Sequence, residues 1–273
     1  MGALDGKVAF ISGAARGQGR SHAICLAQEG ADIIAVDICD QIDTVPYSLS
    51  TVDDLEATAD AVASLGRKVV AQVADVREPC ELERVVSEAT RDLGPIDIVV
   101  ANAGIAALGS NGLRPEREFR DIVDVNLIGV WNTVMATAPG MRAAGNGGSI
   151  VLVSSTQGLK ATGSDGTAAA TAYTASKHGV VGLMRSFAIA YAPDSIRVNS
   201  VHPTGVETPM IMNDVVAGYM ADNPSVADMA ANLLPVSLLA PADVSDAVLW
   251  LVSDSAKYVT GVALPVDAGF SIR

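Results

Sequence analysis

Aromatic side chains and cysteines are scarce in this chain. Trp, Tyr and Phe make up 4% of the 273 residues, although 49% are hydrophobic, so Ala, Val, Ile and Leu carry most of the apolar load. That bias is typical of parallel strands that helices cover on both faces. The three cysteines, Cys25, Cys39 and Cys80, show no CxxC spacing. We therefore expect a reducing compartment and no disulfide framework.

Positive charge is also limited. The chain has 18 Lys and Arg against 31 Asp and Glu, a formal net charge of −13. Nucleic acids and anionic membrane surfaces would repel such a protein, so neither is expected as a partner. The three histidines, His22, His178 and His202, lack the spacing of metal ligands, and no metal site is predicted.

Long apolar runs are missing as well. No stretch reaches the ~18 consecutive apolar residues that indicate a membrane-spanning helix. Residues 1–7 lack the basic and apolar regions of a signal peptide. We therefore expect a cytoplasmic protein.

Strand and helix signals alternate along the whole chain. The predicted strands are 7–12, 32–37, 68–74, 96–101, 149–155, 196–201 and 262–266. The predicted helices are 17–29, 55–65, 82–93, 119–144, 172–192 and 242–252. This order predicts one α/β domain, residues 1–273, with a Rossmann-type doubly wound parallel sheet of about seven strands and helices on both faces.

Two long segments interrupt that pattern. Residues 38–54 form a polar connection between the second strand and its helix, and residues 204–241 form an apolar, Met-rich stretch. Connections of this length are usually functional or disordered, and the second is too apolar for disorder. We interpret 38–54 as a cofactor-side insertion, a surface loop without function being the alternative. We interpret 204–241 as a substrate-covering segment, in which flexible methionines suit a hydrophobic ligand.

A glycine-rich turn, SGAARGQG at residues 12–19, lies between the first predicted strand and helix. Backbone N–H groups at a helix N-terminus attract phosphate, and Gly13, Gly17 and Gly19 let a pyrophosphate approach the chain closely. With Asp37 closing the next strand, this context predicts a dinucleotide site.

Asp37 favours NAD over NADP. A carboxylate there can accept hydrogen bonds from ribose hydroxyls, and it would repel a 2′-phosphate. Arg16 is the contrary observation, because it could attract such a phosphate. Residues 38–41 offer no second cation and add Asp40.

Four polar residues form a candidate catalytic set. Tyr173 and Lys177 are four apart on a predicted helix and share a face. Ser155 ends the fifth strand, at the edge where open α/β sheets bind ligands, and Asn126 lies in the preceding helix. A neighbouring ammonium favours a phenolate, so Lys177 is expected to help Tyr173 act as a base.

The GxxxGxG turn, Asn102-Ala103-Gly104, the Ser155-Thr156-Gln157-Gly158 segment and the Tyr173/Lys177 pair resemble the short-chain dehydrogenase/reductase family over nearly the full length. The resemblance implies the Asn126, Ser155, Tyr173 and Lys177 tetrad, with Tyr173 as base, Ser155 on the substrate oxygen and Asn126 holding a proton-relay water. It also implies cofactor contacts from Gly13, Arg16, Gly17, Gln18, Gly19, Asp37, Asp75, Val76, Asn102, Ala103, Gly104, Tyr173, Lys177, Pro203, Val206 and Thr208.

The chain departs from the family in two places. Thr204 stands where the family usually has Gly. Eighteen positions separate Ser155 from Tyr173, more than is usual, and residues 160–171 are read as a looped insertion that leaves both ends in place. Ser154 is interpreted as a packed strand end.

The insertion and the segments KHGVVGLMRSFA, HPTGVETPMI and LPVDAGF resemble the mycofactocin-associated, carveol dehydrogenase-like branch of the family. This resemblance implies tightly held NAD, a small hydrophobic alcohol or ketone as substrate, a mycofactocin-type redox partner and a homotetramer. The alternatives are a reductase of 3-oxoacyl or other carbonyls and a catalytically silent NAD-binding protein. The intact Tyr173 and Lys177 pair argues against the silent protein.

Overall fold

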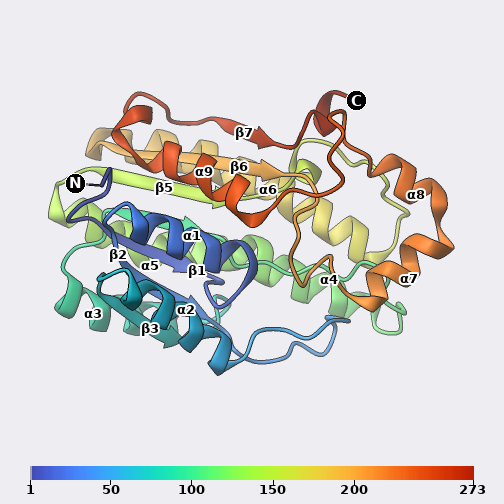
Figure 1. Ribbon diagram of the computed structural model, residues 1–273, viewed down its shortest axis with the longest axis horizontal. Coiled ribbons are helices and arrows are strands. Elements are labelled where there is room, and N and C mark those ends of the chain that lie inside the picture. Colours follow the sequence, from blue (N-terminus) through green and yellow to red (C-terminus); the bar gives the residue numbers. More distant parts are fainter. Residues whose placement is uncertain (1) are drawn as a thin grey trace.

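A parallel sheet of seven strands forms the centre of the computed structural model, which describes residues 2–273 (Figure 1). The strands are β1 Val8–Ser12, β2 Asp32–Asp37, β3 Val69–Val73, β4 Ile98–Ala101, β5 Gly148–Val153, β6 Ile196–Pro203 and β7 Ala263–Val266. Their order is β3-β2-β1-β4-β5-β6-β7, and every neighbouring pair is parallel. The predicted doubly wound sheet is therefore confirmed. The strand order reverses between β1 and β4, where open sheets of this kind leave a crevice for ligands.

Helices cover both faces of the sheet. They are α1 Gly17–Gln28, α2 Val52–Ser64, α3 Pro79–Leu93, α4 Pro115–Val123, α5 Gly129–Ala144, α6 Ala168–Tyr191, α7 Asp214–Asp222, α8 Pro224–Met229 and α9 Pro241–Val252. One layer contains α1, α2 and α9, with α1 packed against the other two, and the opposite layer contains α3, α5 and α6 (Figure 1). The short helices α7 and α8 project beyond the carboxyl ends of the strands.

Alternate side chains of each strand pack into two different hydrophobic cores, one on each face of the sheet. On β1, Val8 and Phe10 pack into the core under α3, α5 and α6, whereas Ala9 and Ile11 pack into the core under α1 and α9. Successive strand residues point to opposite faces, so a strand buried on both sides needs an unbroken apolar run. The absence of alternating polarity in VAFI follows from that double burial.

The helix predicted at 119–144 begins earlier and is not uniform. α4 starts at Pro115, and a π-helical turn, Asp124–Ile128, separates it from α5. Single π-turns inside helices often occur at functional sites, and this turn contains Asn126. No sequence pattern distinguished it, because a π-turn changes the hydrogen-bond ladder by one residue without changing composition.

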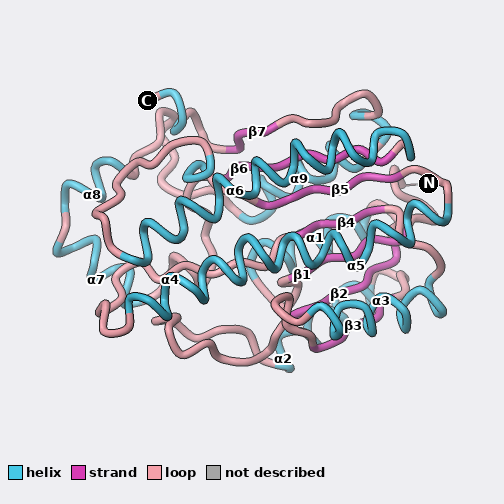
Figure 2. Tube along the Cα trace, turned by 180° about the vertical axis from the view of Figure 1, so that it is seen from behind, coloured by secondary structure: helices cyan, strands magenta, loops and turns pink. Residues whose placement is uncertain are grey.

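The long connections gather at one end of the molecule, at the carboxyl edge of the sheet (Figure 2). Residues 204–241 contain α7 and α8, which sequence reasoning did not predict. Within residues 2–273, no helix has the length and apolar character needed to cross a membrane.

Residues 38–54 are more ordered than their polar composition indicated. Ile42, Val45 and Tyr47 are buried in the main core. The Gln41 side chain fills the middle of the loop: its amide nitrogen donates to three loop carbonyls, and its oxygen accepts the Leu49 N–H at 2.9 Å. One side chain therefore satisfies the backbone of a turn that has no regular secondary structure.

Candidate active site at the carboxyl edge of the sheet

The glycine turn between β1 and α1 packs too tightly for larger residues. Gly13 has φ +67°, and a Cβ there would lie 2.8 Å from the Ala103 Cα. A Cβ on Gly19 would lie 1.9 Å from the Gly13 carbonyl oxygen. The glycines therefore set the shape of the turn, and Gly19 does so from behind it rather than from the cavity wall.

Asn102 fixes the glycine turn from β4. Its side-chain nitrogen donates to the Ser12 and Gly13 carbonyl oxygens at 3.0 and 3.1 Å. The Ser12 hydroxyl accepts the Asn102 and Ala103 backbone N–H groups at 3.1 and 3.2 Å. These contacts join the carboxyl ends of the two strands that flank the crevice.

Asp37 is buried at the end of β2, beside the cavity. One carboxylate oxygen accepts the Ala15 N–H at 2.9 Å, and the other accepts the Ser50 hydroxyl at 2.5 Å. Each carboxylate oxygen can accept more than one hydrogen bond, so Asp37 retains capacity for a ligand hydroxyl. The Ser50 contact also brings the two ends of the 38–54 insertion together.

The insertion closes over the cavity. Ile38, Ile42, Tyr47, Leu49 and Ser50 line the cavity together with the glycine turn. The Arg16 guanidinium donates to the Ser48 carbonyl oxygen at 2.5 Å, which ties the turn to the insertion. Arg16 thus has a partner in the insertion, while it also faces the cavity.

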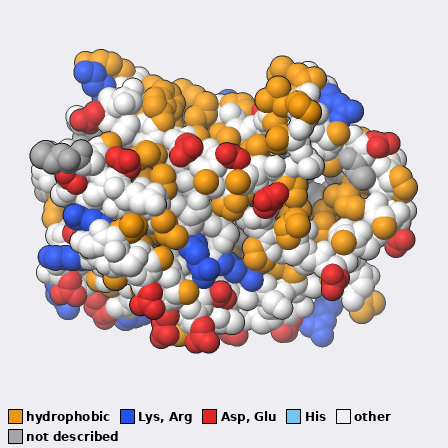
Figure 3. Space-filling view, in the orientation of Figure 1, with side chains coloured by type: hydrophobic (Ala, Val, Ile, Leu, Met, Phe, Trp, Pro, Cys, Tyr) orange, Lys and Arg blue, Asp and Glu red, His pale blue; other side chains and the backbone are white. Residues whose placement is uncertain are grey.

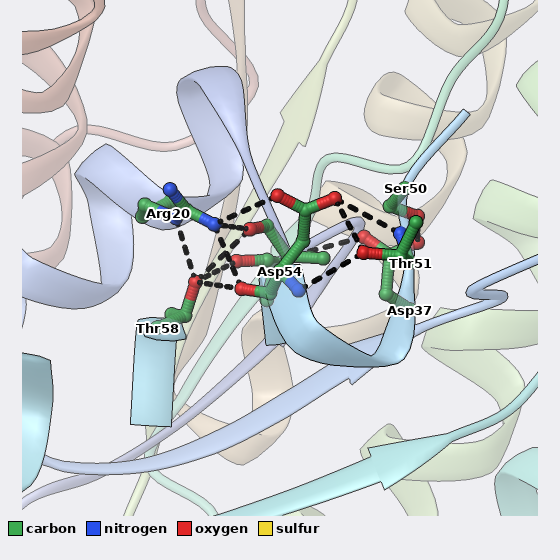
Figure 4. Close-up of polar contacts among 8 residues, drawn as sticks. Arg20, Asp37, Ser50, Thr51, Asp54 and Thr58 are labelled. Atoms are coloured by element: carbon green, nitrogen blue, oxygen red, sulfur yellow. Dashed lines mark hydrogen bonds and ion pairs between the residues drawn. The ribbon is translucent and has the colours of Figure 1, made fainter. Parts of the chain in front are cut away.

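Arg20 anchors the base of this arrangement, a role that no sequence motif indicated. Figure 4 shows Arg20 beside Asp54 and Thr58 of α2, with Ser50, Thr51 and Asp37 on the other side of Asp54. Arg20 donates to the Thr58 hydroxyl at 3.0 Å and pairs with the Asp54 carboxylate at 3.4 Å. Thr51 and Asp54 form a capping box that starts α2 where the insertion ends.

The cavity residues fit a dinucleotide. Backbone N–H groups at the start of α1 suit a pyrophosphate, and Ala74, Val76 and Ile38 give apolar walls beside the Asp37 carboxylate. The Gln18 amide oxygen is buried without a partner in this cavity. The predicted residues that line it are Gly13, Arg16, Gly17, Gln18, Asp37, Asp75, Val76, Asn102, Ala103, Gly104, Tyr173, Lys177 and Thr208.

Three residues of the predicted cofactor set lie outside that lining. Gly19 packs behind the turn, and Pro203 ends β6. Val206 is buried and forms a bridge with Leu239, so it holds the backbone of the following segment. Asp75 lines the cavity, and its carboxylate is paired with Arg77.

Lys177 is buried beside Tyr173. Its ammonium donates to the Val153 carbonyl oxygen at 2.9 Å and lies 5.7 Å from the centre of the Tyr173 ring. Burial lowers the pKa of Lys177 to about 8. An ammonium has three donors, so two remain for other groups.

The pKa of the Tyr173 phenol differs from the expected one. Burial raises its pKa above the ordinary value of 10, and a hydrogen bond from Ser155 lowers it in part. We expected Lys177 to favour the phenolate, but in the protein alone desolvation is the larger effect. The predicted looped insertion at 160–171 is too long: residues 160–167 form the loop, and residues 168–171 are the first turn of α6. Ser155 nevertheless lies within hydrogen-bond reach of Tyr173.

Ser155 has a defined hydrogen-bond direction. Its hydroxyl oxygen accepts the Gln157 N–H at 3.1 Å, which leaves the hydroxyl proton free to be donated. Ser154 donates instead to the Lys177 carbonyl oxygen at 2.9 Å, so it is a packing residue, although one edge of it reaches the cavity. A Cβ on Gly158 would lie 2.4 Å from the Ser154 hydroxyl oxygen, which explains the glycine.

Asn126 lies behind the cavity, in the π-turn. Its side-chain oxygen accepts the Ile105 N–H at 2.8 Å, and its nitrogen donates to the Ile105 carbonyl oxygen at 2.9 Å. A Cβ on Gly104 would lie 3.4 Å from that side-chain oxygen and 3.5 Å from the Lys177 nitrogen. Asn126 therefore fixes the backbone that separates it from Lys177.

The substrate side is apolar. Met210 and Pro209 line the cavity, and the Thr208 methyl group lies 3.2 Å from the position of a Cβ on Gly17. Figure 3 shows hydrophobic side chains gathered over the half of the molecule that carries α7 and α8. Met212 is 62% exposed, so the four methionines of this segment do not share one environment.

A contact between two irregular segments holds the covering helix. The Tyr219 hydroxyl of α7 donates to the Asp165 carboxylate at 3.1 Å, and the Thr167 N–H and hydroxyl donate to the same carboxylate. These hydrogen bonds lower the pKa of Asp165. Sequence reasoning missed this pair, because nothing in either segment indicated that they meet.

Sequence reasoning identified the insertion as a unit but not its contact residues. The signal was present: Ile42, Val45, Tyr47 and Leu49 are apolar positions in an otherwise polar stretch. Three of these four are buried, as apolar residues in an Ω-type loop often are.

The doubly wound sheet and the cavity over its glycine turn define a dinucleotide-binding class of protein. A family profile described as "Enoyl-(Acyl carrier protein) reductase" matches residues 13–271. The chain belongs to the short-chain dehydrogenase/reductase family. A similar solved structure, a short-chain dehydrogenase from Mycobacterium paratuberculosis bound to NAD, is 46% identical with a TM-score of 0.93 and covers both chains completely.

Similar proteins cover the full chain. An uncharacterized oxidoreductase of Mycobacterium tuberculosis is 52% identical over 98% of this chain and 97% of its own. The (-)-trans-carveol dehydrogenase of Rhodococcus erythropolis is 47% identical over all of both chains. The carveol dehydrogenase of Mycobacterium avium in complex with NAD is 46% identical with a TM-score of 0.91, covering both chains completely.

Proposed function

We propose that the protein oxidises a small hydrophobic secondary alcohol of the carveol type to its ketone, reversibly, with NAD that it holds tightly. The observation that carries the proposal is the insertion, whose buried residues close the cavity from the adenosine side. The apolar substrate side and the similarity to a (-)-trans-carveol dehydrogenase support the substrate class.

Tyr173, Ser155 and Lys177 would perform the proton chemistry. NAD, when bound, accepts the hydride from the alcohol carbon. Tyr173 would take the hydroxyl proton, and Ser155 would keep its own proton and donate a hydrogen bond to the oxygen that becomes the carbonyl. The two remaining donors of Lys177 would hold the cofactor ribose and favour the Tyr173 phenolate.

Asn126 and the cofactor residues have supporting roles in this proposal. Asn126 would keep the 105–106 backbone and a proton-relay water in place beside Lys177. The glycine turn and Gln18 would bind the pyrophosphate, Asp37 the adenosine ribose, and Thr208 the nicotinamide end. Asp75, Val76 and the Asn102-Ala103-Gly104 segment would flank the adenine and ribose groups, with Pro203 and Val206 shaping the segment that carries Thr208.

Tight NAD binding implies that the cofactor is recycled in place. We propose a cytoplasmic protein of one domain that passes electrons to an external, mycofactocin-type redox partner. The support is the closure of the insertion by Gln41, Arg16 and Tyr47, since enclosure slows release more than association.

We also propose a homotetramer. Ile128, Trp131 and Met135 of the helix around α5 are 42 to 43% exposed and share one face. A second apolar group near the C-terminus contains Leu233 and Leu234, whose N–H groups donate to the Ala268 carbonyl oxygen, and Ile272; their exposures are 58%, 60% and 83%. Two separate apolar surfaces are what a tetramer with two kinds of interface needs.

Native mass spectrometry tests the proposal. Purified protein should carry NAD after exhaustive dialysis, and single-turnover absorbance should show NADH formation with carveol. A variant in which two glycines replace residues 40–48 keeps Ser50 and the α2 cap, and the Ser50–Asp37 hydrogen bond shows that the ends are close enough to join. It should lose NAD faster.

Equal loss of NAD from the shortened and complete proteins would contradict the role of the insertion. Turnover of an acetoacetyl thioester with NADPH, and not of carveol with NAD, would favour a 3-oxoacyl reductase. Absence of both turnovers with NAD retained would favour the catalytically silent protein.

A further inference from the structure

His202 is a fully buried histidine in β6 that no motif explains. Its exposure is 0%, and both ring nitrogens have partners. Nδ1 lies 2.8 Å from the Ser155 carbonyl oxygen, and Nε2 lies 2.8 Å from the Ser200 hydroxyl oxygen. The ring thus connects β6 to the residue that follows β5.

The chemistry of the partners fixes the tautomer. A carbonyl oxygen can only accept, so Nδ1 must carry the proton that His202 shares with Ser155. Nε2 then has a free lone pair, which accepts the Ser200 hydroxyl proton. Burial, opposed by the hydrogen bond to Ser155 and aided by the nearby Lys177 and His178 charges, lowers the pKa of His202 to about 4, so the ring is neutral at pH 7.

The Ser155 carbonyl has two donors of different origin. The Gly158 N–H, within the same short turn, donates at 2.8 Å, and His202 donates from the neighbouring strand. The first bond shapes the turn locally. Of these two bonds, only the second reaches the neighbouring strand, to which the adjacent Ser154 N–H also donates, at the Val201 carbonyl oxygen, at 2.9 Å. The sheet also holds Lys177 through the Val153 carbonyl.

We propose that His202 is a positioning residue that sets the place of the Ser155 hydroxyl relative to Tyr173. Ser155 then directs its free proton to the phenol oxygen or to the substrate oxygen. The inference rests on the proposed roles of Ser155 and Tyr173, which require that the Ser155 hydroxyl be held in place, and it assigns this positioning to His202.

Two substitutions separate the two ring nitrogens. In His202→Asn the side-chain nitrogen occupies the place of Nδ1 and can still donate to Ser155. In His202→Gln the amide reaches the place of Nε2 and Ser200, and the Ser155 contact is lost. Both variants remove the ring and both leave a buried amide, so each controls for the other.

Single-turnover hydride transfer with carveol and NAD is the first measurement. His202→Gln should be slowed about ten- to a hundredfold, because small displacements of a catalytic group have effects of that size. His202→Asn should stay within about threefold of wild type by the same reasoning. NADH fluorescence titration should show unchanged affinity in both variants.

The pH profile of the same step is the second measurement. Tyr173 is faced by Ser155, by Lys177 on its own helix and by Tyr47 of the insertion. Only the Ser155 hydrogen bond changes in His202→Gln, so the rising limb should move to higher pH in that variant and not in His202→Asn. Equal rates and equal profiles in the two variants would overturn the inference.

Nitrogen-15 NMR of labelled histidine in the wild type is independent of substrate and of variant stability. The chain has three histidines, so the His202 signal is assigned by its loss in a variant. It should show the Nδ1–H tautomer from pH 8 to about pH 5. An Nε2–H tautomer would overturn the inference. If the wild type shows the expected tautomer but does not oxidise carveol, only the proposed substrate is contradicted.

Discussion

At the scale of single residues, the site depends on which atoms are already occupied. The Ser155 hydroxyl oxygen accepts the Gln157 N–H, and its proton remains free to be donated. The Ser154 hydroxyl instead donates its proton to the Lys177 carbonyl oxygen. Two adjacent serines thus have different chemical capacities. The Ser155 hydrogen bond to Tyr173 lowers the pKa of the phenol in part, which supports the proposed role of Tyr173 as proton acceptor.

Tyr173→Phe should abolish turnover and leave NAD binding intact, because only the proton acceptor is removed. Loss of at least a hundredfold in rate is expected from general-base catalysis. Tyr191→Phe is the matched control, since Tyr191 lies on the same helix and its hydroxyl has only a 4.0 Å contact with the Met135 sulfur. Turnover of the Tyr173 variant within tenfold of wild type would contradict the assignment.

Asp37→Ala should narrow the preference for NAD over NADP. The substitution removes a ribose partner and the repulsion of a 2′-phosphate, while Arg16 stays in place. Asp40→Ala is the control, because the Asp40 carboxylate accepts only the Gln41 N–H. The ratio of NAD to NADP affinity measures the effect, and an unchanged ratio in Asp37→Ala would mean that Asp37 contributes nothing to selection.

At the scale of elements, the insertion is a structure in its own right. Gln41 bonds to four backbone groups of the loop, and substitution by alanine would remove the partner of the Val45 and Tyr47 carbonyl oxygens and of the Leu49 N–H. The Ile42 carbonyl oxygen would keep its bond from the Val45 N–H. Gln41→Ala should raise hydrogen exchange across residues 42–49 and speed NAD loss several-fold, because about 1 kcal/mol is typical for each lost hydrogen bond. Gln72→Ala at a partly exposed strand position should leave both unchanged, and equal exchange in the Gln41 variant would contradict the closed loop.

The regular strands and helices were predictable because each type of element has the same physical requirement wherever it occurs in the sequence. Strands buried on both faces need runs such as VAFIS and DIIAVD, and Gly30 and Gly94 mark helix ends. The π-turn at Asn126 and helices α7 and α8 were not predictable in this way. They depend on tertiary partners, and the Tyr219–Asp165 contact joins segments 54 residues apart.

The residues of the candidate site also fall into two groups, those that sequence patterns predicted and those that depend on tertiary partners. Positions after strand ends, such as Asp37 and Asn102, were readable because parallel strands bring their carboxyl ends together. The roles of Arg20, Tyr47 and His202 could not be predicted from the sequence, because these side chains act by hydrogen bonding to backbone atoms of other segments. A side chain that recognises a carbonyl leaves no motif in the sequence.

At the scale of the whole molecule, the exposed apolar face of α5 predicts an interface. Trp131→Asp should convert a tetramer into a smaller species in analytical ultracentrifugation, because a charge would be buried without a partner. Leu113→Asp is the control, since Leu113 is 79% exposed on a loop outside both apolar surfaces. An unchanged sedimentation coefficient in Trp131→Asp would exclude this face as an interface.

Acid should destabilise the protein through its buried histidines. Burial lowers the pKa of His22 to about 3 and that of His202 to about 4, from 6.5. Below pH 6.5 the unfolded chain binds protons that the folded chain does not, so stability falls as pH drops toward 4. Each histidine contributes about 1.4 kcal/mol per pH unit in that window.

Urea unfolding between pH 7 and pH 4.5 measures this slope. His22→Gln should reduce it by about half, because one of the two contributing groups is removed. The carboxyl groups with lowered pKa values, Asp54 and Asp165, lose most of their contribution below pH 4.5, because their ordinary pKa is 3.8, so they add little to the slope in this range. A slope unaffected by the substitution would contradict the assignment to His22.

The Tyr47 hydroxyl accepts the Ala106 N–H at 3.3 Å, next to the Ile105 backbone that Asn126 holds. An opening of the insertion would break that bond and release the backbone in front of Lys177. Under the proposed function, exchange of the dinucleotide and reaction of the alcohol would then need different conformations of the insertion. An enzyme that retains its cofactor in this way would stop after one oxidation in the presence of dissolved NAD alone, and would resume only when an electron acceptor reached the bound cofactor.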